Sequence, residues 1–263
     1  CAIICHATPM PPRELTALAL TITPFPTPNQ DERPPEVNDI DTLVLHYTGM
    51  RSANDALNRM RDPVWKVSAH WCVDEDGTIY SLVPEEMRAW HAGVSWWRGR
   101  SNLNDHSIGI EIVNPGHEFG YRPFPAAQMN ALIQLCEAIQ ARHVIDPRNV
   151  VGHADIAPSR KRDPGELFDW ARLAREGIGV WPEPVAEPDP TLSVTRPEQG
   201  RHVRDWQSRL TQFGYGLYED GVFGEETEHV ITAFQRHFRQ ARVDGVLDAG
   251  TGAILKHLIA ADD

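Results

Sequence analysis

The sequence contains no apolar run that approaches the ~20 residues a membrane-spanning helix needs, so we expect no transmembrane segment. Positive charge is also in short supply. The chain has 25 lysines and arginines against 37 aspartates and glutamates, which gives a formal net charge of −12 and a pI of about 5.4. Phosphate backbones and anionic lipids repel such a chain, which argues against nucleic acid or a membrane surface as its main partner.

Cysteine is scarce as well. The four cysteines lie at positions 1, 5, 72 and 136, and their spacing does not match a cysteine-based metal site. Cys72 falls in a strand pattern and Cys136 on the apolar side of a helix pattern. We therefore expect both as buried thiols and not as disulfide partners.

The length of 263 residues, with 41% hydrophobic and 24% charged residues, suits a globular chain of one large or two ordinary domains. Residues 182–199 contain five prolines and no hydrophobic period, the composition of a semi-rigid linker. Residues 1–40 are rich in proline and nearly aperiodic. We predict an extended N-terminal arm (1–40), a larger domain (41–181), the linker (182–199) and a small C-terminal domain (200–263).

Hydrophobic periods in the larger domain alternate between strand and helix. Residues 42–47 and 107–113 read as strands, and residues 67–73 and 78–82 flank an Asp-Gly turn as a hairpin. Helical spacing covers three further stretches: 52–60, 126–143 and 166–176. This order predicts an α/β domain in which a central mixed β-sheet is flanked by helices.

The stretch 149–165, NVVGHADIAPSRKRDPG, holds three residues able to do chemistry: His153, Lys161 and Asp163. His153 ends a short apolar strand pattern, and a loop follows it. On its own the stretch also fits a solvated basic loop. His46 ends the strand 42–47, where it is either a core histidine or a second ligand. Two histidines and a carboxylate are the donors of a catalytic zinc site with an open fourth position.

Glu111 lies in the middle of the strand 107–113. A carboxylate there is costly unless it is paired or functional. The alternatives are an exposed sheet face or pairing with an arginine. A functional carboxylate beside the proposed metal ligands fits better, because all of these side chains would then lie at one edge of the sheet.

Four segments, LVLHYT, VSAHW, AWHAGVSWWRGRSNLNDHSIGIEIVN and VVGHADIAPSRKRDPG, resemble the zinc-dependent N-acetylmuramoyl-L-alanine amidases, relatives of phage lysozyme-amidases and peptidoglycan recognition proteins. The resemblance runs from about residue 41 to residue 181. It implies one Zn²⁺ per chain. The implied roles are as follows: His46, His153 and Asp163 as zinc ligands, Glu111 and Lys161 as the catalytic pair, and Trp90, His91 and Asn104 as substrate-binding residues.

The loop 89–104 is expected to line the site. Arg98 and Arg100 in this loop, with 160–162 in the later loop, form a predicted basic cluster that could hold the carboxylates of a peptide stem. Solvated surface charge is the alternative for any single arginine. His70 is expected as a core residue, a neighbour of a ligand or a cleft wall, with the wall favoured.

The last sixty residues contain a repeat, D-G-V-x-x-x-x-T, at 220–227 and again at 244–251. Apolar spacing around it predicts three helices, which resemble the three-helix peptidoglycan-binding domain of cell-wall hydrolases. A packing module that only stabilises the enzyme is the alternative.

The resemblance implies hydrolysis of the amide between N-acetylmuramic acid, or its anhydro form, and L-alanine in peptidoglycan or in muropeptides that are recycled. The alternatives are a non-catalytic peptidoglycan-binding protein and a zinc peptidase that cuts within the stem peptide. We expect a monomer. A lipidated Cys1 would place the chain in the bacterial cell envelope, which is the favoured location, whereas a start at Met10 would leave it in the cytoplasm.

Overall fold

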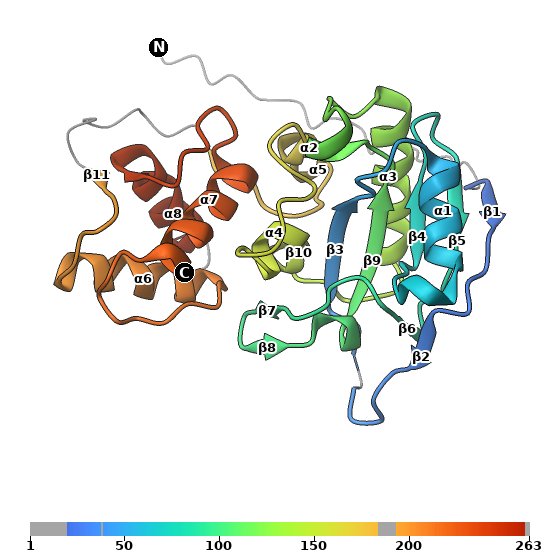
Figure 1. The fold of residues 1–263 in the computed structure, drawn as a ribbon, viewed down its shortest axis with the longest axis horizontal. Coiled ribbons are helices and arrows are strands. Elements are labelled where there is room, and N and C mark those ends of the chain that lie inside the picture. The colour runs from blue at the N-terminus through green and yellow to red at the C-terminus, as the bar shows by residue number, and fades with distance from the viewer. Residues whose placement is uncertain (1–19, 38, 184–192, 261–263) are drawn as a thin grey trace, which may run out of the picture.

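The computed structural model describes residues 20–37, 39–183 and 193–260 (Figure 1). A six-stranded mixed sheet forms its centre. In spatial order the strands are β1 (Ile22–Pro24), β5 (Ile79–Ser81), β4 (Trp71–Val73), β9 (Ser107–Ile112), β3 (Thr42–Tyr47) and β10 (Val150–Gly152). Only the β4–β5 pair is antiparallel, and the other neighbours run parallel. The predicted α/β architecture is confirmed.

The sheet packs against helices on both of its faces. Apolar side chains on one face of β3 and β9 pack against α3 (Ala126–Gln140), which buries its own apolar stripe there; the cluster includes Leu43, Leu45, Ile108, Ile110, Met129, Leu132, Cys136 and Ile139. The opposite face is covered at one side by α1 (Ala53–Arg61), which begins at the capping residue Ser52. Figure 1 places α3 and α1 on opposite faces of the sheet. Cys72 and Cys136 are buried free thiols, as expected.

The segment before β3 is more than an arm across the surface. Within it, β1 adds an edge strand to the main sheet beside β5, and β2 (Gln30–Glu32) pairs with β6 (Met87–Ala89). Arg33 donates hydrogen bonds to main-chain oxygens of Glu85, Asn104 and Ser107. The predicted arm is therefore wrong for residues 20–37, and residues 1–19 lie outside the described part. Short polar strands such as QDE carry no period that could have revealed this pairing.

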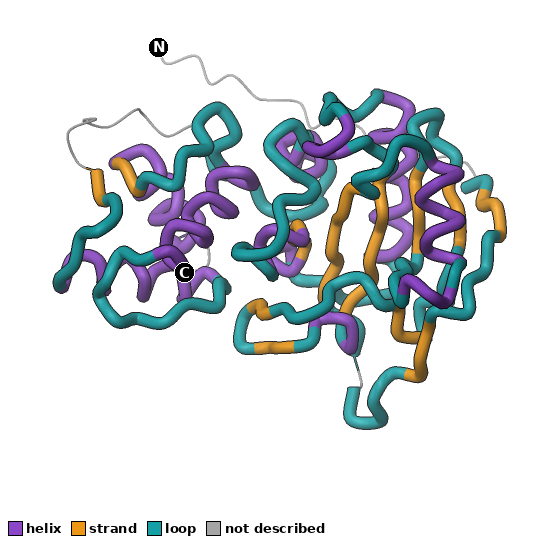
Figure 2. The backbone as a smooth tube through the Cα atoms, viewed as in Figure 1, coloured by secondary structure: helices purple, strands orange, loops and turns teal. Residues whose placement is uncertain are grey.

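The loops carry more structure than their sequence suggests (Figure 2). The stretch 89–104 contains a small hairpin of β7 (Trp96–Trp97) and β8 (Arg100–Ser101), and single helical turns occur at Pro63–Trp65, Leu103–Asp105, Gly116–Phe119 (α2) and Pro147–Asn149. The helix expected over 166–176 is shorter, because α5 (Trp170–Arg175) begins where the Asp169 side chain accepts a hydrogen bond from Arg172 N.

The C-terminal part contains the three predicted helices: α6 (Arg201–Phe213), α7 (Glu225–Phe238) and α8 (Ala249–Ala260). A pair of short strands, β11 (Ser193–Val194) and β12 (Leu247–Asp248), joins the end of the predicted linker to this unit. Residues 184–192 of the linker lie outside the described residues.

Each copy of the D-G-V repeat is held by one buried glutamine. Gln207 Nε2 donates to Asp220, Val222 and Thr227, and Gln207 Oε1 accepts from Gly221 N. Gln235 makes the same set of contacts with the second copy: Asp244, Val246, Thr251 and Gly245 N. The repeated Asp, Gly and Thr are thus structural, because they satisfy a buried amide in both copies.

The two units share an extensive contact. One apolar cluster includes Trp97, Val151 and Ile156 of the larger unit together with Phe213 and Tyr215 of the smaller one. Hydrogen bonds cross the same boundary, from Arg98 N to Gly214 O at 2.8 Å and from Arg148 Nη2 to Leu258 O at 2.7 Å. In Figure 1 the short helix α4 (His153–Ile156) lies between the sheet and the C-terminal helices. Among the described residues, no helix is long and apolar enough to cross a membrane.

Candidate active site

Three buried side chains from separate parts of the chain meet at the carboxyl end of β3. His46 is the penultimate residue of β3, His153 is the first residue of α4, and Asp163 lies in the loop after α4. The two Nδ1 atoms are 2.9 Å apart, and Asp163 Oδ2 lies 3.2 Å from the Nδ1 of His46 and 3.1 Å from that of His153. The three residues predicted as metal ligands are neighbours in space, and together they form a group able to hold a metal ion.

The second ring nitrogen of each histidine already has a partner. His153 Nε2 donates to Ala92 O over 3.1 Å, which leaves its Nδ1 unprotonated in the neutral ring. Ser107 Oγ donates to Leu103 O, so it accepts from His91 Nε2. The proton of His91 is therefore on Nε2, and its Nδ1 accepts a hydrogen bond from His46 Nε2 over 3.1 Å. Both histidines therefore direct an Nδ1 lone pair at the same point, next to a carboxylate oxygen. Two such nitrogens and one oxygen fit a zinc ion with its fourth position open.

The electrostatics favour a neutral imidazole at His46 and an ionised carboxylate at Asp163. Burial, with the neighbouring His153, lowers the pKa of His46 to about 4, so this ring is neutral at neutral pH. Burial alone would raise the pKa of Asp163, but its contacts with the two histidines, His153 before His46, outweigh burial and hold the pKa well below its usual range. These are the protonation states in which both residue types bind metals.

His91 is buried against His46, with the ring centroids 5.1 Å apart. Its position depends on Gly109 of β9, where a Cβ would lie 2.4 Å from His91 Cγ. The ring lines the cleft, but its hydrogen bonds are used to hold His46. Its predicted role as a substrate-binding residue is therefore secondary to this contact with a predicted ligand.

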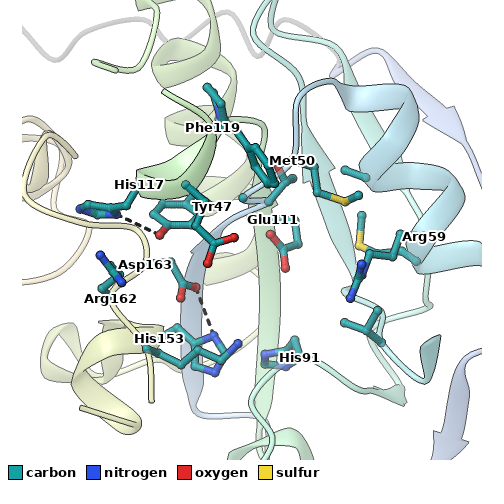
Figure 3. Close-up of a pocket in the computed structure, with 18 of the residues that line it drawn as sticks. Tyr47, Met50, Arg59, His91, Glu111, His117, Phe119, His153, Arg162 and Asp163 are labelled. Carbon is teal, nitrogen blue, oxygen red and sulfur yellow. Dashed lines mark hydrogen bonds and ion pairs between the residues drawn. The ribbon is translucent and has the colours of Figure 1, made fainter. Parts of the chain in front are cut away.

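Glu111 is the register partner of His46 on the neighbouring parallel strand β9. Figure 3 shows its carboxylate directed into the same space as Asp163 and His91. Burial, and then the charge of Asp163, raises the pKa of Glu111 well above its ordinary value. Its Oε2 atom is buried and has no hydrogen-bond partner among the described residues. An unpaired carboxylate beside a predicted metal group is the placement expected of a general acid and base.

A cleft of about 610 Å³ opens over these residues (Figure 3). Its walls combine basic side chains with aromatic and apolar ones; they include Arg59, Arg160, Lys161, Arg162, Tyr47, Met50, Trp65, His117 and Phe119. Lys161 lines the same cleft as Glu111, and its positive charge also lowers the pKa of both His46 and Glu111. An acidic protein thus presents a basic cleft, which suits a substrate with carboxylates.

Other predicted residues lie elsewhere. Asn104 Oδ1 accepts from His91 N and Ala92 N and so fixes the loop behind the cleft, and Trp90 Nε1 donates to Asp31. Neither is among the described residues that line the cleft. Asn104 and Trp90 therefore hold the loop in place, and their role in substrate binding stays a prediction.

The predicted basic cluster is split. Arg98 pairs with Asp146 and Arg100 with Asp41, whereas residues 160–162 reach the cleft. His70 was expected as a cleft wall. It is instead a core residue, because it is fully buried and its Nδ1 accepts a hydrogen bond from Gly109 N.

Sequence reasoning missed two parts of the cleft. Tyr47 Oη and His117 Nδ1 are 3.0 Å apart on one wall, and Arg59 covers the ring of Trp65 at 4.0 Å on another. Tyr47 directly follows His46 and could have been found from that neighbour. His117, Arg59 and Trp65 lie in segments whose sequence shows only ordinary helix and turn patterns, which do not indicate a cleft.

Comparison with known proteins agrees with this geometry. Residues 36–166 match the family model described as N-acetylmuramoyl-L-alanine amidase, and residues 199–255 match a putative peptidoglycan binding domain. The chain is 41% identical to the N-acetylmuramoyl-L-alanine amidase AmiD of Escherichia coli over 84% of this chain and 82% of that protein. It is 36% identical to the 1,6-anhydro-N-acetylmuramyl-L-alanine amidase AmpD of Haemophilus influenzae over 56% of this chain and 86% of that protein.

Two solved structures resemble the whole fold. One is the complex of E. coli AmiD with the substrate anhydro-N-acetylmuramic acid-L-Ala-D-gamma-Glu-L-Lys, with a TM-score of 0.73 and 38% identity over 88% of this chain and 92% of that one. The other is AmpDh3 of Pseudomonas aeruginosa with anhydromuramic pentapeptide, with a TM-score of 0.71 and 33% identity over 87% and 94%.

Proposed function

The chain belongs to the N-acetylmuramoyl-L-alanine amidase family, and on that premise we propose that the cleft over His46, His153 and Asp163 is where it hydrolyses its substrate. The bond cut joins N-acetylmuramic acid, or its anhydro form, to L-alanine. The observation that carries the assignment is the convergence of two Nδ1 atoms, one carboxylate oxygen and the unpaired Glu111 in one basic cleft.

We propose one Zn²⁺ per chain, held by His46 Nδ1, His153 Nδ1 and Asp163 Oδ2. A zinc ion in such a site acidifies water and polarises a carbonyl group, which an amide needs because it is a poor electrophile. Asp163 contributes the negative charge. Ala92 O and His91 hold the ring planes of the two histidines and keep their protons on Nε2.

Glu111 moves the proton. No described residue bonds to its Oε2, and its raised pKa makes it a stronger base than an exposed glutamate. We assign to it removal of a proton from the attacking water and delivery of that proton to the leaving nitrogen of L-alanine. The proton then ends on the product amine, and Glu111 returns to its starting state.

Lys161 stabilises the developing oxyanion. Lys161 lines the cleft together with Glu111, and its positive charge acts on both Glu111 and His46. One well-placed donor of this kind lowers an acyl-transfer barrier by roughly 3–4 kcal/mol. Arg59 and Arg162, on different walls of the cleft, are suited to bind the free carboxylates of a stem peptide, since guanidinium groups pair with carboxylates through two hydrogen bonds.

We propose that the C-terminal helices bind peptidoglycan, on the basis of the match over residues 199–255. Binding to the polymer places the protein in the cell envelope, with the cytoplasm and soluble muropeptides as the alternative. One chain supplies every proposed catalytic group, so a monomer is sufficient.

Mass spectrometry of the products tests this proposal. Zinc-loaded protein is incubated with purified peptidoglycan and, in parallel, with anhydro-muropeptides. We expect free stem peptides that begin with L-alanine, and none after chelation. Cleavage inside the stem would identify a peptidase, and protein that pellets with the wall but releases nothing would be a binding protein only.

A further inference from the structure

The turn that presents His153 is too short to hold itself in place. Helix α4 spans only His153–Ile156, and its N-cap residue, Gly152, has no side chain with which to cap it. Isolated helical turns are unstable in water, because forming the first turn fixes several dihedral angles for one hydrogen bond. Something outside the turn must therefore fix its orientation.

Asp155 supplies that restraint at the start of the turn. Its Oδ2 accepts from Gly152 N over 2.7 Å, the hydrogen bond that ties the third residue of a helix back to its cap. The side chain is buried, with an exposed fraction of 2%. A buried carboxylate needs further donors, and among the described residues of the larger unit Gly152 N is the one hydrogen-bond donor to Asp155.

The remaining donors come from the C-terminal helical unit. Tyr215 Oη donates to Asp155 Oδ1 over 2.7 Å, and His237 Nδ1 donates to Asp155 Oδ2 over 2.8 Å. Both are buried, at 1% and 4% exposure. The His237 ring also stacks on Trp170 at 3.8 Å between centroids, which fixes its plane. Tyr215 and His237 follow Asp155 by 60 and 82 positions in the sequence, and both bond to its carboxylate beside the site.

The same turn also holds the second predicted ligand segment. Ala154 N donates to Asp163 O over 2.9 Å, and Gly152 packs so closely on Pro164 that a Cβ there would lie 2.7 Å from Pro164 Cδ. Any tilt of α4 therefore moves His153 directly and shifts the main chain of Asp163 with it.

We propose that Asp155 is a positioning residue through which the C-terminal unit, by Tyr215 and His237, sets the geometry of the metal site. The C-terminal unit is then part of the catalytic apparatus as well as a module for wall binding. This inference rests on the proposed zinc site. It differs from simple adhesion between the two units, which would affect stability but not metal affinity.

Zinc affinity of the full-length protein, measured by competition with a chromophoric chelator, tests the proposal. Tyr215→Phe removes one hydroxyl, and Asp155→Asn keeps the side-chain shape but removes the charge. Partners outside the ligand set typically contribute 10- to 100-fold in metal affinity, so we expect about tenfold weaker zinc binding for Tyr215→Phe and a larger loss for Asp155→Asn. Tyr218→Phe is the matched control, because Tyr218 is 79% exposed in the same unit.

A second control separates positioning from loss of stability. Gln207→Ala removes the amide that holds the first D-G-V turn, away from Asp155, and should destabilise the C-terminal unit without changing zinc affinity. If folded Tyr215→Phe and Asp155→Asn bind zinc as tightly as the wild type, the proposal is wrong. If Tyr215→Phe does not fold, the zinc affinity of Asp155→Asn alone tests the proposal. If Asp155→Asn does not fold either, His237→Gln is measured in its place. A wild-type protein that binds no stoichiometric zinc would instead refute the metal site itself.

Discussion

His46 and Glu111 are direct neighbours on the parallel strands β3 and β9, so their side chains leave the same face of the sheet at the same level. One is a predicted metal ligand, and the other is a cleft carboxylate whose Oε2 has no hydrogen-bond partner among the described residues. The register of two buried strands therefore sets the distance between the metal group and the base. A rigid sheet is a more accurate support for this pair than two loops would be.

Replacing Glu111 should separate catalysis from metal binding. In Glu111→Gln the shape of the side chain is kept but the proton acceptor is lost, so we expect turnover to fall by about 10²–10⁴. Zinc content should stay at the wild-type level, because Glu111 is not in the ligand group. Amide hydrolysis and metal content are measured on the same sample, with His153→Ala losing both as the comparison. Near-normal turnover of Glu111→Gln would remove this residue from the mechanism.

The same substitution should stabilise the zinc-free protein at neutral and alkaline pH. The pKa of Glu111 is raised in the folded state, so ionisation opposes folding once the pH exceeds the ordinary carboxyl pKa. Below that pKa the side chain is protonated in both states and the effect is absent. We expect Glu111→Gln to be more stable than the wild type by about 1–3 kcal/mol at high pH, the usual cost of an unpaired buried polar group.

Urea unfolding in the presence of a chelator measures this difference across pH. The stability difference between Glu111→Gln and the wild type should grow as the pH rises above the ordinary glutamate value and close as it falls below it. A difference that is constant with pH would show that packing, and not ionisation, is responsible.

Much of this site can be predicted from the sequence where periodic strands carry the residues. The alternation around Glu111 and the apolar run before His46 place both on core strands, and the sheet then brings them together. The positions of Asn104 and Trp90 outside the lining of the cleft could not be predicted, because their loop has no hydrophobic period. Its path is fixed by tertiary bonds, such as those from His91 N and Ala92 N to Asn104 Oδ1, which no local pattern encodes.

The contact between the two units could not be predicted from the sequence either, because it also depends on tertiary hydrogen bonds. Tyr215 and His237 look like ordinary core residues of a small helical domain, and Asp155 looks like a surface acid in a loop. Only the packed structure turns these three into one buried group. The α5 boundary, by contrast, could have been found, because Asp169 is a recognisable N-cap residue.

Gly109 should be intolerant of even the smallest side chain. In Gly109→Ala the new Cβ would lie 2.4 Å from His91 Cγ, so the ring must move and its hydrogen bond to His46 Nε2 must lengthen or break. We expect weaker zinc binding by about tenfold, together with a loss of stability of about 1–3 kcal/mol from overpacking. Competition with a chelator and urea unfolding report the two effects. Gly224→Ala is the control, because a Cβ there meets open space; equal zinc affinity in both variants would show that His91 does not support His46.

The glutamines of the D-G-V repeats should matter for stability and not for chemistry. Gln207→Leu and Gln235→Leu each leave a buried turn amide, Gly221 N or Gly245 N, without its acceptor, which costs about 1–3 kcal/mol. Because the two sites are equivalent in structure but separate in space, the losses should add in the double variant. Gln240 offers no such test, since it bonds across the boundary to Phe168 O. Thermal unfolding measures the losses, with turnover on soluble muropeptides at saturating zinc as the readout that should not change. A fall in that turnover at full zinc occupancy would mean that the repeats act on the site, and that the effect of the C-terminal unit is not confined to Asp155.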